Sequence, residues 1–188
     1  MATKNTRFLI LIGGCSRTGK SYLAQELERK FRLNNVNSIV LNLDNWLIGI
    51  DERTGKETVS ERYNYPKIIS SVQKIMKGDR IFPPFYNSKT RLVTKSNETI
   101  SVQLDAGICI VNGVVTLDIP ELRKLANLKI FTEVNDDIRK HRLMEFYYQY
   151  KGCSSEESKM IIGERELEEV PYIKKTKIFA DIVYQPKY

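Results

Sequence analysis

The chain has 188 residues, 41% of them hydrophobic and 28% charged, and a formal net charge of +7. This is the composition of an ordinary globular protein, and no apolar run approaches the roughly 18 residues that span a bilayer. We therefore expect a single domain over residues 1–188 with no membrane partner. The N-terminus shows no signal-peptide pattern, which leads us to expect a cytoplasmic location.

Few residues are available for metal or redox chemistry. The three cysteines at 15, 109 and 153 lie far apart, and His141 is the only histidine. The cysteine spacing argues against a disulfide framework and a C-x-x-C metal site. A single histidine argues against a metal site built from several histidines. The basic residues are dispersed and accompany no nucleic-acid-binding motif, so the positive charge indicates a small anionic ligand rather than nucleic acid.

The first recognisable motif lies near the N-terminus. Residues 14–21 read G-C-S-R-T-G-K-S, which fits the phosphate-binding loop pattern G-x-x-x-x-G-K-[ST]. An apolar run at 8–12 precedes the loop, and apolar residues at helical spacing follow it, so it lies between a strand and a helix as its mechanism requires. The predicted nucleotide-binding residues are Gly14, Ser16, Arg17, Thr18, Gly19, Lys20 and Ser21. Lys20 is expected to reach the β- and γ-phosphates, and the Ser21 hydroxyl to bind Mg²⁺.

A second strand is predicted at 38–43, followed directly by Asp44. In open α/β sheets the ligand crevice lies outside the carboxyl ends of the strands, so Asp44 and the phosphate loop should face the same space. An isolated strand-end aspartate more often caps a turn, but the neighbouring loop favours a functional role. The polar segment 51–58 indicates a surface loop.

The middle of the chain predicts a helix and then an excursion. Apolar residues between Ile68 and Met76 mark a helix face that stops at Gly78. Two prolines at 83 and 84 exclude a central strand, and the alternating pattern up to Gln103 indicates a small β-hairpin excursion over about 80–104. Its turn is expected at Lys95-Ser96-Asn97.

The remaining elements alternate between strand and helix. Strands are predicted at 106–113, 128–134 and 180–184. Asn135 can cap one helix, and the capping box Ser154-x-x-Glu157 opens another. This alternation predicts an α/β fold with a parallel sheet covered by helices on both faces.

Taken together, these blocks resemble the uridine kinase and phosphoribulokinase family of P-loop small-molecule kinases, over nearly the whole chain. The matching blocks are the phosphate loop, Leu43-Asp44-Asn45-Trp46, the segment from Gly78 to Arg91, Pro120-Glu121-Leu122-Arg123, residues 128–139, and Thr176 to Ile182. The resemblance implies a P-loop NTPase three-layer sandwich, and transfer of a phosphoryl group from ATP (or GTP), with Mg²⁺, to a hydroxyl of a small acceptor. A nucleoside is the default acceptor, and self-association is implied as well.

Residue roles also follow from the resemblance. It implies Asp44 as the catalytic base acting with Lys20, and Ser21 with Asp44 at the metal. It further implies that Tyr63, Tyr86 and Arg91 contact the acceptor, and that a lid over about 136–153 carries Arg139 and Arg142 over the phosphates.

The chain departs from the family pattern at four places. Asn112 stands where the family has a metal-associated glutamate, and Lys67 stands where uridine kinases have an acid that binds the sugar. The segment from Tyr86 to Arg91 is shorter and lacks the family's histidine, and the lid is rich in aromatic residues rather than arginine. These lid aromatics indicate packing or an oligomer contact, with base stacking as the alternative. Asn112 motivates a second hypothesis, a nucleotide-binding regulatory protein that has lost catalysis.

Overall fold

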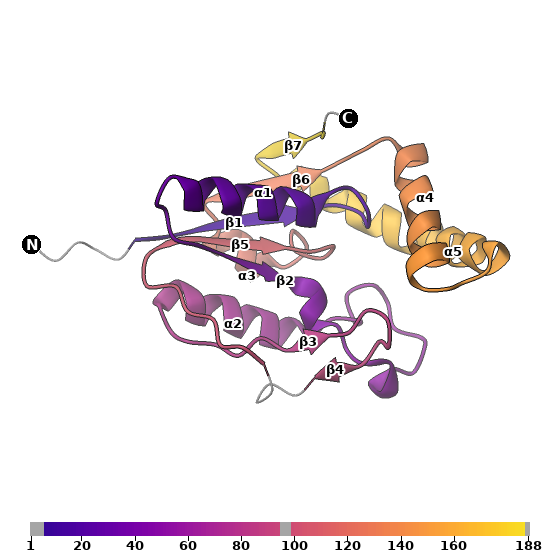
Figure 1. The fold of residues 1–188 in the computed structure, drawn as a ribbon, viewed down its shortest axis with the longest axis horizontal. Coiled ribbons are helices and arrows are strands. Elements are labelled where there is room, and N and C mark those ends of the chain that lie inside the picture. The colour runs from indigo at the N-terminus through magenta and orange to yellow at the C-terminus, as the bar shows by residue number, and fades with distance from the viewer. Residues whose placement is uncertain (1–5, 95–98, 187–188) are drawn as a thin grey trace, which may run out of the picture.

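A computed structural model describes residues 6–94 and 99–186. Its centre is a five-stranded sheet with the order β2-β5-β1-β6-β7, in which every neighbouring pair is parallel (Figure 1). The strands are β1 (Arg7–Gly13), β2 (Ser38–Asn42), β5 (Gly107–Asn112), β6 (Leu128–Thr132) and β7 (Ile182–Tyr184). The predicted parallel sheet is confirmed, and its carboxyl ends all lie at one edge.

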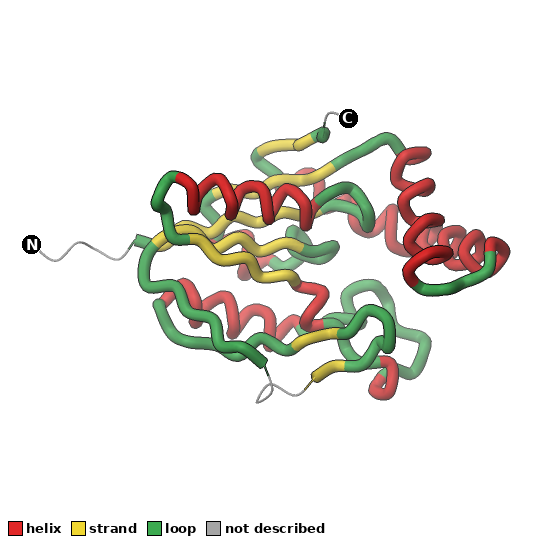
Figure 2. The backbone as a smooth tube through the Cα atoms, viewed as in Figure 1, coloured by secondary structure: helices red, strands yellow, loops and turns green. Residues whose placement is uncertain are grey.

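Helices cover both faces of this sheet, as the sequence predicts (Figure 2). Leu9 and Leu11 of β1 belong to the larger core, on the side of α2 (Tyr65–Lys77), α3 (Pro120–Leu125) and α5 (Ser155–Lys175). Ile10 and Ile12 point the other way and pack against α1 (Lys20–Leu33). A strand buried on both faces needs apolar residues at successive positions, which explains the continuous apolar run of β1.

The helix ends follow the signals in the sequence. The Asn64 side chain accepts a hydrogen bond from the backbone N–H of Lys67, and α2 stops at Gly78, whose φ is 95°. Asn135 caps α4 (Asp136–Glu145), and the capping box Ser154/Glu157 opens α5. In the described ranges, no helix combines the length and apolar character that crossing a membrane requires.

The excursion contains the expected hairpin, with β3 (Phe85–Tyr86) antiparallel to β4 (Val93–Thr94). The turn that joins the two strands is 87–92, and the turn expected at Lys95-Ser96-Asn97 lies outside the described residues. The Asn87 side chain accepts hydrogen bonds from the backbone N–H groups of Lys89 and Thr90, which fixes this turn.

Several short helical segments complete the chain. They are η1 (Leu43–Trp46), η2 (Ile50–Glu52), the π-helical turn η4 (Phe146–Tyr150) that continues α4, and η5 (Thr176–Phe179). Asp44 therefore lies in a turn that directly follows β2. The short helix α3 was not predicted.

Candidate active site

The phosphate loop connects the carboxyl end of β1 to the first residue of α1. Gly14 has φ 137°, and a Cβ there would collide with the carbonyl oxygen of Thr132. Gly19 caps α1 with φ 94°, a left-handed conformation that favours glycine. The two glycines thus let the loop turn tightly at a helix N-terminus, where backbone N–H groups attract phosphate.

Lys20 is buried, and its ammonium donates a hydrogen bond of 2.7 Å to the carbonyl oxygen of Cys15. Burial lowers the pKa of Lys20, and the negative charge of Asp44 opposes that shift. Burial also raises the pKa of the Cys15 thiol, which supports its interpretation as a small loop side chain. The Lys20 side chain therefore points into the phosphate loop, where it is expected to bind phosphate.

Threonine hydroxyls connect the loop to the neighbouring strand. Thr18 donates a hydrogen bond of 2.8 Å to the carbonyl of Cys15, and its Oγ1 lies 2.6 Å from Oγ1 of Thr132 at the end of β6. Thr132 in turn donates to the carbonyl of Gly13. A buried hydroxyl needs a hydrogen-bond partner. The contacts of Thr18 and Thr132 therefore fix the loop to itself and to the end of β6.

Ser21 and Asn112 form the part of the site that fits a magnesium ion. The Ser21 hydroxyl donates a hydrogen bond of 3.3 Å to Oδ1 of Asn112, a buried residue at the end of β5. Within residues 6–94 and 99–186 no cluster of three or more His, Cys, Asp or Glu could hold a metal. A hydroxyl beside an amide oxygen, with one carboxylate nearby, nevertheless suits Mg²⁺, which keeps several water ligands.

Asp44 lies in η1 with its side chain accessible to solvent, yet surrounding protein atoms displace much of its water. This desolvation raises the pKa of Asp44, the ammonium of Lys20 opposes the shift, and the carboxylate of Glu169 adds to it. The phenol of Tyr63 donates a hydrogen bond of 3.4 Å to Oδ1 of Asp44. Asp44, Lys20 and Tyr63 are therefore close enough to act on one another.

Tyr86 lies in β3 of the hairpin, and Arg91 lies in the turn that joins β3 to β4. β3 packs against η1, which carries Asp44. Arg91 has a positive φ of 63°, and its backbone is fixed by hydrogen bonds to Asn87 and Ile50. Burial lowers the pKa of Arg53, Tyr86 opposes this shift and Arg91 adds to it. Nη2 of Arg53 is buried and has no hydrogen-bond partner among the described residues.

The lid contacts the phosphate loop through Arg17. The Arg17 guanidinium lies 3.8 Å from the centre of the Phe146 ring. The backbone carbonyl oxygen of Arg17 accepts a hydrogen bond from the Arg142 side chain. Phe146 stacks on Tyr150, whose phenol oxygen accepts a hydrogen bond from Ser88 in the hairpin turn. Tyr147 is buried and its ring contacts Phe146, whereas Tyr148 and Tyr150 are exposed, so the structure shows packing within this segment for Phe146 and Tyr147.

Arg139 takes a different position. Its side chain is 2% exposed and forms ion pairs with Asp136 and with Glu166 of α5. The sequence indicated a contact with phosphate for this residue, whereas the structure places its charge between α4 and α5. Figure 1 shows both helices beside the carboxyl ends of the strands.

Two residues of α5 at the phosphate loop were missed by the sequence analysis. The Ser16 hydroxyl donates a hydrogen bond of 2.7 Å to the buried carboxylate of Glu169. Arg165 Nη1 donates to that carboxylate at 2.8 Å and to the Ser16 hydroxyl oxygen at 3.1 Å. Arginine and glutamate four residues apart on a helix predict an ion pair, but nothing in that spacing says that the pair faces a loop 150 residues away.

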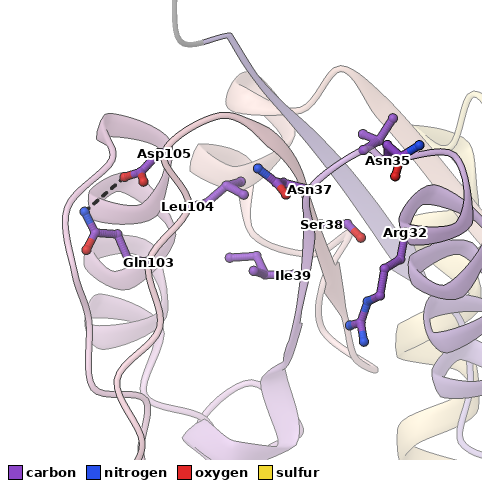
Figure 3. A pocket seen from close by; sticks show the side chains of 9 residues that line it. Arg32, Asn35, Asn37, Ser38, Ile39, Gln103, Leu104 and Asp105 are labelled. Atoms are coloured by element: carbon purple, nitrogen blue, oxygen red, sulfur yellow. Dashed lines mark hydrogen bonds between the residues drawn. The ribbon is translucent and has the colours of Figure 1, made fainter.

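A cavity of about 540 Å³ lies at the opposite end of the sheet. Its lining includes Arg32 at the end of α1, Ser38 and Ile39 at the beginning of β2, and Gln103 in the segment before β5 (Figure 3). Strands of a parallel sheet bind ligands at their carboxyl ends, so this cavity is not part of the site that the phosphate loop defines.

The fold and the phosphate loop define a nucleotide-binding protein of the P-loop class. The family model described as "Phosphoribulokinase / Uridine kinase family" matches residues 9–187, and the chain belongs to this family. The predicted resemblance is therefore confirmed.

Individual relatives agree with this assignment. The chain is 27% identical over 143 residues to the uridine kinase of Leuconostoc citreum, covering 73% of this chain and 67% of the relative. It is 25% identical over 182 residues to the uridine kinase of Clostridium novyi, covering 93% and 85%. The crystal structure of a candidate fructose transport system kinase from Silicibacter sp. TM1040 has the same fold, with a TM-score of 0.79 at 13% identity, and the match covers 98% of this chain and 92% of that one.

Proposed function

We propose that the protein transfers the γ-phosphoryl group of ATP to a hydroxyl group of a small metabolite, with a nucleoside as the expected acceptor. The observation that carries this proposal is that Asp44 lies in the turn at the carboxyl end of β2, at the same edge of the sheet where the phosphate loop follows β1, and that its charge acts on Lys20. The printed names of the two uridine kinases support a nucleoside. GTP is the alternative donor.

Asp44 serves as the general base in this reaction. The acceptor hydroxyl gives its proton to Asp44 as its oxygen bonds to the γ-phosphorus, and the bond from that phosphorus to the β–γ bridging oxygen breaks. The products are ADP and the phosphorylated acceptor. A raised pKa suits this role, because a carboxylate that is a stronger base accepts a proton more readily near neutral pH.

Lys20 and the metal site would neutralise charge on the phosphates. Lys20 exchanges its hydrogen bond with the Cys15 carbonyl for the β- and γ-phosphates. Ser21 and Asp44 would hold Mg²⁺ with its water ligands, and the amide of Asn112 orients the Ser21 hydroxyl. The bound ion would supply electrostatic stabilisation of the transferring group.

Tyr63, Tyr86 and Arg91 are proposed to contact the acceptor, since they surround the turn that carries Asp44. Arg142 is the lid arginine nearer to the donor, because it already reaches the loop at the Arg17 carbonyl. Arg139 acts on the lid indirectly, by fixing α4 to α5 through Glu166.

The test is ADP formation from Mg·ATP with a panel of nucleosides, ribosylated vitamins and sugar phosphates. Lys20→Ala is the matched blank, since it removes the ammonium without touching the Asp44 turn. We expect turnover with one acceptor class that is lost in the blank. A tightly bound ATP that is never turned over with any acceptor would contradict the proposal.

Asn112 supports a second candidate, a regulatory protein that binds nucleotide without catalysis. An amide in place of a carboxylate weakens the attraction for Mg²⁺ beside Ser21. In a working kinase, Asn112→Glu should raise the affinity for Mg²⁺ and change turnover. In a regulatory protein, the same variant should leave ADP formation at background.

A further inference from the structure

The longest helix of the structure, α5, joins the phosphate loop through one compact cluster of three residues. Glu169 is buried, accepts a hydrogen bond from Ser16 through Oε1 and another from Arg165 through Oε2. Arg165 also donates to the Ser16 hydroxyl oxygen at 3.1 Å. Ser16, Glu169 and Arg165 therefore form a closed ring of hydrogen bonds at the rim of the loop.

This rim faces the side on which phosphoryl transfer would take place. Ser16 is the third residue of the loop, and Arg165 is close enough to Asp44 to be influenced by its negative charge. Glu169 acts on Lys20 in the same way. Arg165 thus contacts the loop that would hold the donor, and it lies within electrostatic range of the carboxylate that would receive the acceptor's proton.

The guanidinium of Arg165 has hydrogen-bonding capacity to spare. Its hydrogen bonds to Ser16 and Glu169 both use Nη1, and its guanidinium carbon lies 5.8 Å from the centre of the Tyr147 ring, whereas a guanidinium offers five N–H donors. Glu169 lies one helical turn away on the same helix and orients the side chain. Arg165 can therefore keep this orientation while its other nitrogens donate to a phosphate.

The other arginines near the donor are already engaged. Arg139 pairs with Glu166 and Asp136. Arg142 donates to a loop carbonyl, and Arg17 stacks on Phe146. The lid is also poor in arginine compared with the family pattern, so an arginine from another element would add to the charge that Lys20 and Arg142 bring to the phosphates.

We propose that Arg165 contacts the transferred phosphoryl group as an arginine finger supplied from within the same chain, oriented by Glu169. The inference rests on the proposed kinase function. Such an arginine stabilises charge on the equatorial oxygens of the transition state, and arginine fingers contribute about 10³–10⁵ in kcat.

The first test compares the binding of ADP with that of a non-hydrolysable ATP analogue, both with Mg²⁺. An arginine at the γ-phosphate contacts only the triphosphate. We expect Arg165→Ala to weaken binding of the analogue by about tenfold or more, while ADP binding stays within about threefold. An equal loss for both nucleotides would overturn the inference and leave Arg165 as a tether of the loop.

The matched control is Arg62→Lys. Arg62 pairs with Glu168 at 2.7 Å and ties the same helix to the segment 57–62. If Arg165 only anchored α5, the two variants would behave alike in thermal unfolding and nucleotide binding. Where Arg165→Ala is too unstable to purify, Arg165→Lys keeps the charge and the pairing with Glu169, and we expect it to show the same selective loss of triphosphate binding, to a smaller degree.

Turnover provides the second test. We expect Arg165→Ala to lower kcat by about 10³ with a small change in KM for the acceptor, and Arg62→Lys to retain wild-type kcat. Wild-type kcat in Arg165→Ala would overturn the inference. If the wild-type protein phosphorylates no acceptor, the kinase proposal fails, while the comparison of ADP with the ATP analogue still decides where Arg165 acts.

Discussion

The phenol of Tyr63 donates its hydrogen bond to the carboxylate of Asp44 across a distance of 3.4 Å, and this hydrogen bond holds down a pKa that desolvation otherwise raises. Tyr63 pairs with the segment after Asp44 through a bridge between Leu47 and its own backbone. The orientation of the proposed base is therefore built into the backbone that follows β2.

Replacing Tyr63 by phenylalanine should move the acidic limb of the pH profile upward. Loss of the hydrogen bond removes an interaction that favours ionised Asp44, so the pKa of Asp44 rises. Activity at low pH then falls, because less of the base is ionised. The measurement is kcat/KM against pH, and Tyr65→Phe, which removes a phenol from Asp118 instead, should leave the limb in place.

Glu169→Gln should shift the same limb in the opposite direction. The carboxylate of Glu169 raises the pKa of Asp44, so neutralising it lowers that pKa and extends activity to more acidic pH. The neighbouring variant Glu168→Gln alters an exposed ion pair with Arg62 and serves as the control. An upward shift, or equal shifts in both variants, would argue against the electrostatic coupling of Glu169 to Asp44.

Asp44→Asn should strongly reduce turnover and raise the thermal stability of the free protein. The fold raises the pKa of Asp44 above the unfolded value near 3.8, so the folded state holds the proton more tightly. Stability contributed in this way is complete below pH 3.8 and declines as the pH rises through the folded pKa. Asparagine does not ionise, so the Tm advantage of the variant should grow over that range and then level off at neutral pH.

Turnover in Asp44→Asn should fall by about 10²–10⁴, the contribution of a positioned general base. The stability scan needs no acceptor, so it tests the electrostatics of the site separately from the reaction. A variant less stable than the wild-type protein at pH 7 would show that the attraction between Asp44 and Lys20 outweighs desolvation.

Arg139→Ala should affect stability more than nucleotide binding. Removing this buried guanidinium leaves Asp136 with Lys174 and Glu166 with Lys140 as their remaining partners, and both carboxylates are partly exposed, so we expect a loss of about 2 kcal/mol in the free energy of unfolding. Lys140→Ala is the control, because its exposed ammonium lies 3.6 Å from the same Glu166 and should contribute little. A large loss of ATP affinity without loss of stability would contradict this structural role and would indicate that Arg139 contacts the phosphates directly.

Local signals explain how far the sequence could predict this structure. The phosphate loop, the caps at Asn64 and Asn135 and the capping box at Ser154 each depend on neighbouring residues, and the strands are marked by their apolar runs. The hairpin turn at 87–92 rests on the Asn87 side chain, which accepts hydrogen bonds from the backbone N–H groups of Lys89 and Thr90, a pattern that many asparagines could form.

The part of the site that was missed depends on tertiary structure. Arg165 and Glu169 are ordinary members of a charged helix until α5 folds across the end of the sheet and brings them to Ser16. Arg139 shows the converse, since its charge is taken up by Glu166, 27 residues further along the chain. Motif spacing cannot report either contact.

Phosphoryl transfer to an acceptor can be measured by following the γ-phosphate itself. Wild-type protein, Lys20→Ala and Asp44→Asn are incubated with γ-labelled ATP, Mg²⁺ and the acceptor panel, and labelled products are identified by mass. If the protein is a kinase with Asp44 as its base, the wild-type protein forms a labelled phosphomonoester of one acceptor class, and both variants form much less of it. Label that stays on ATP, or product formed equally well by Asp44→Asn, would contradict this prediction.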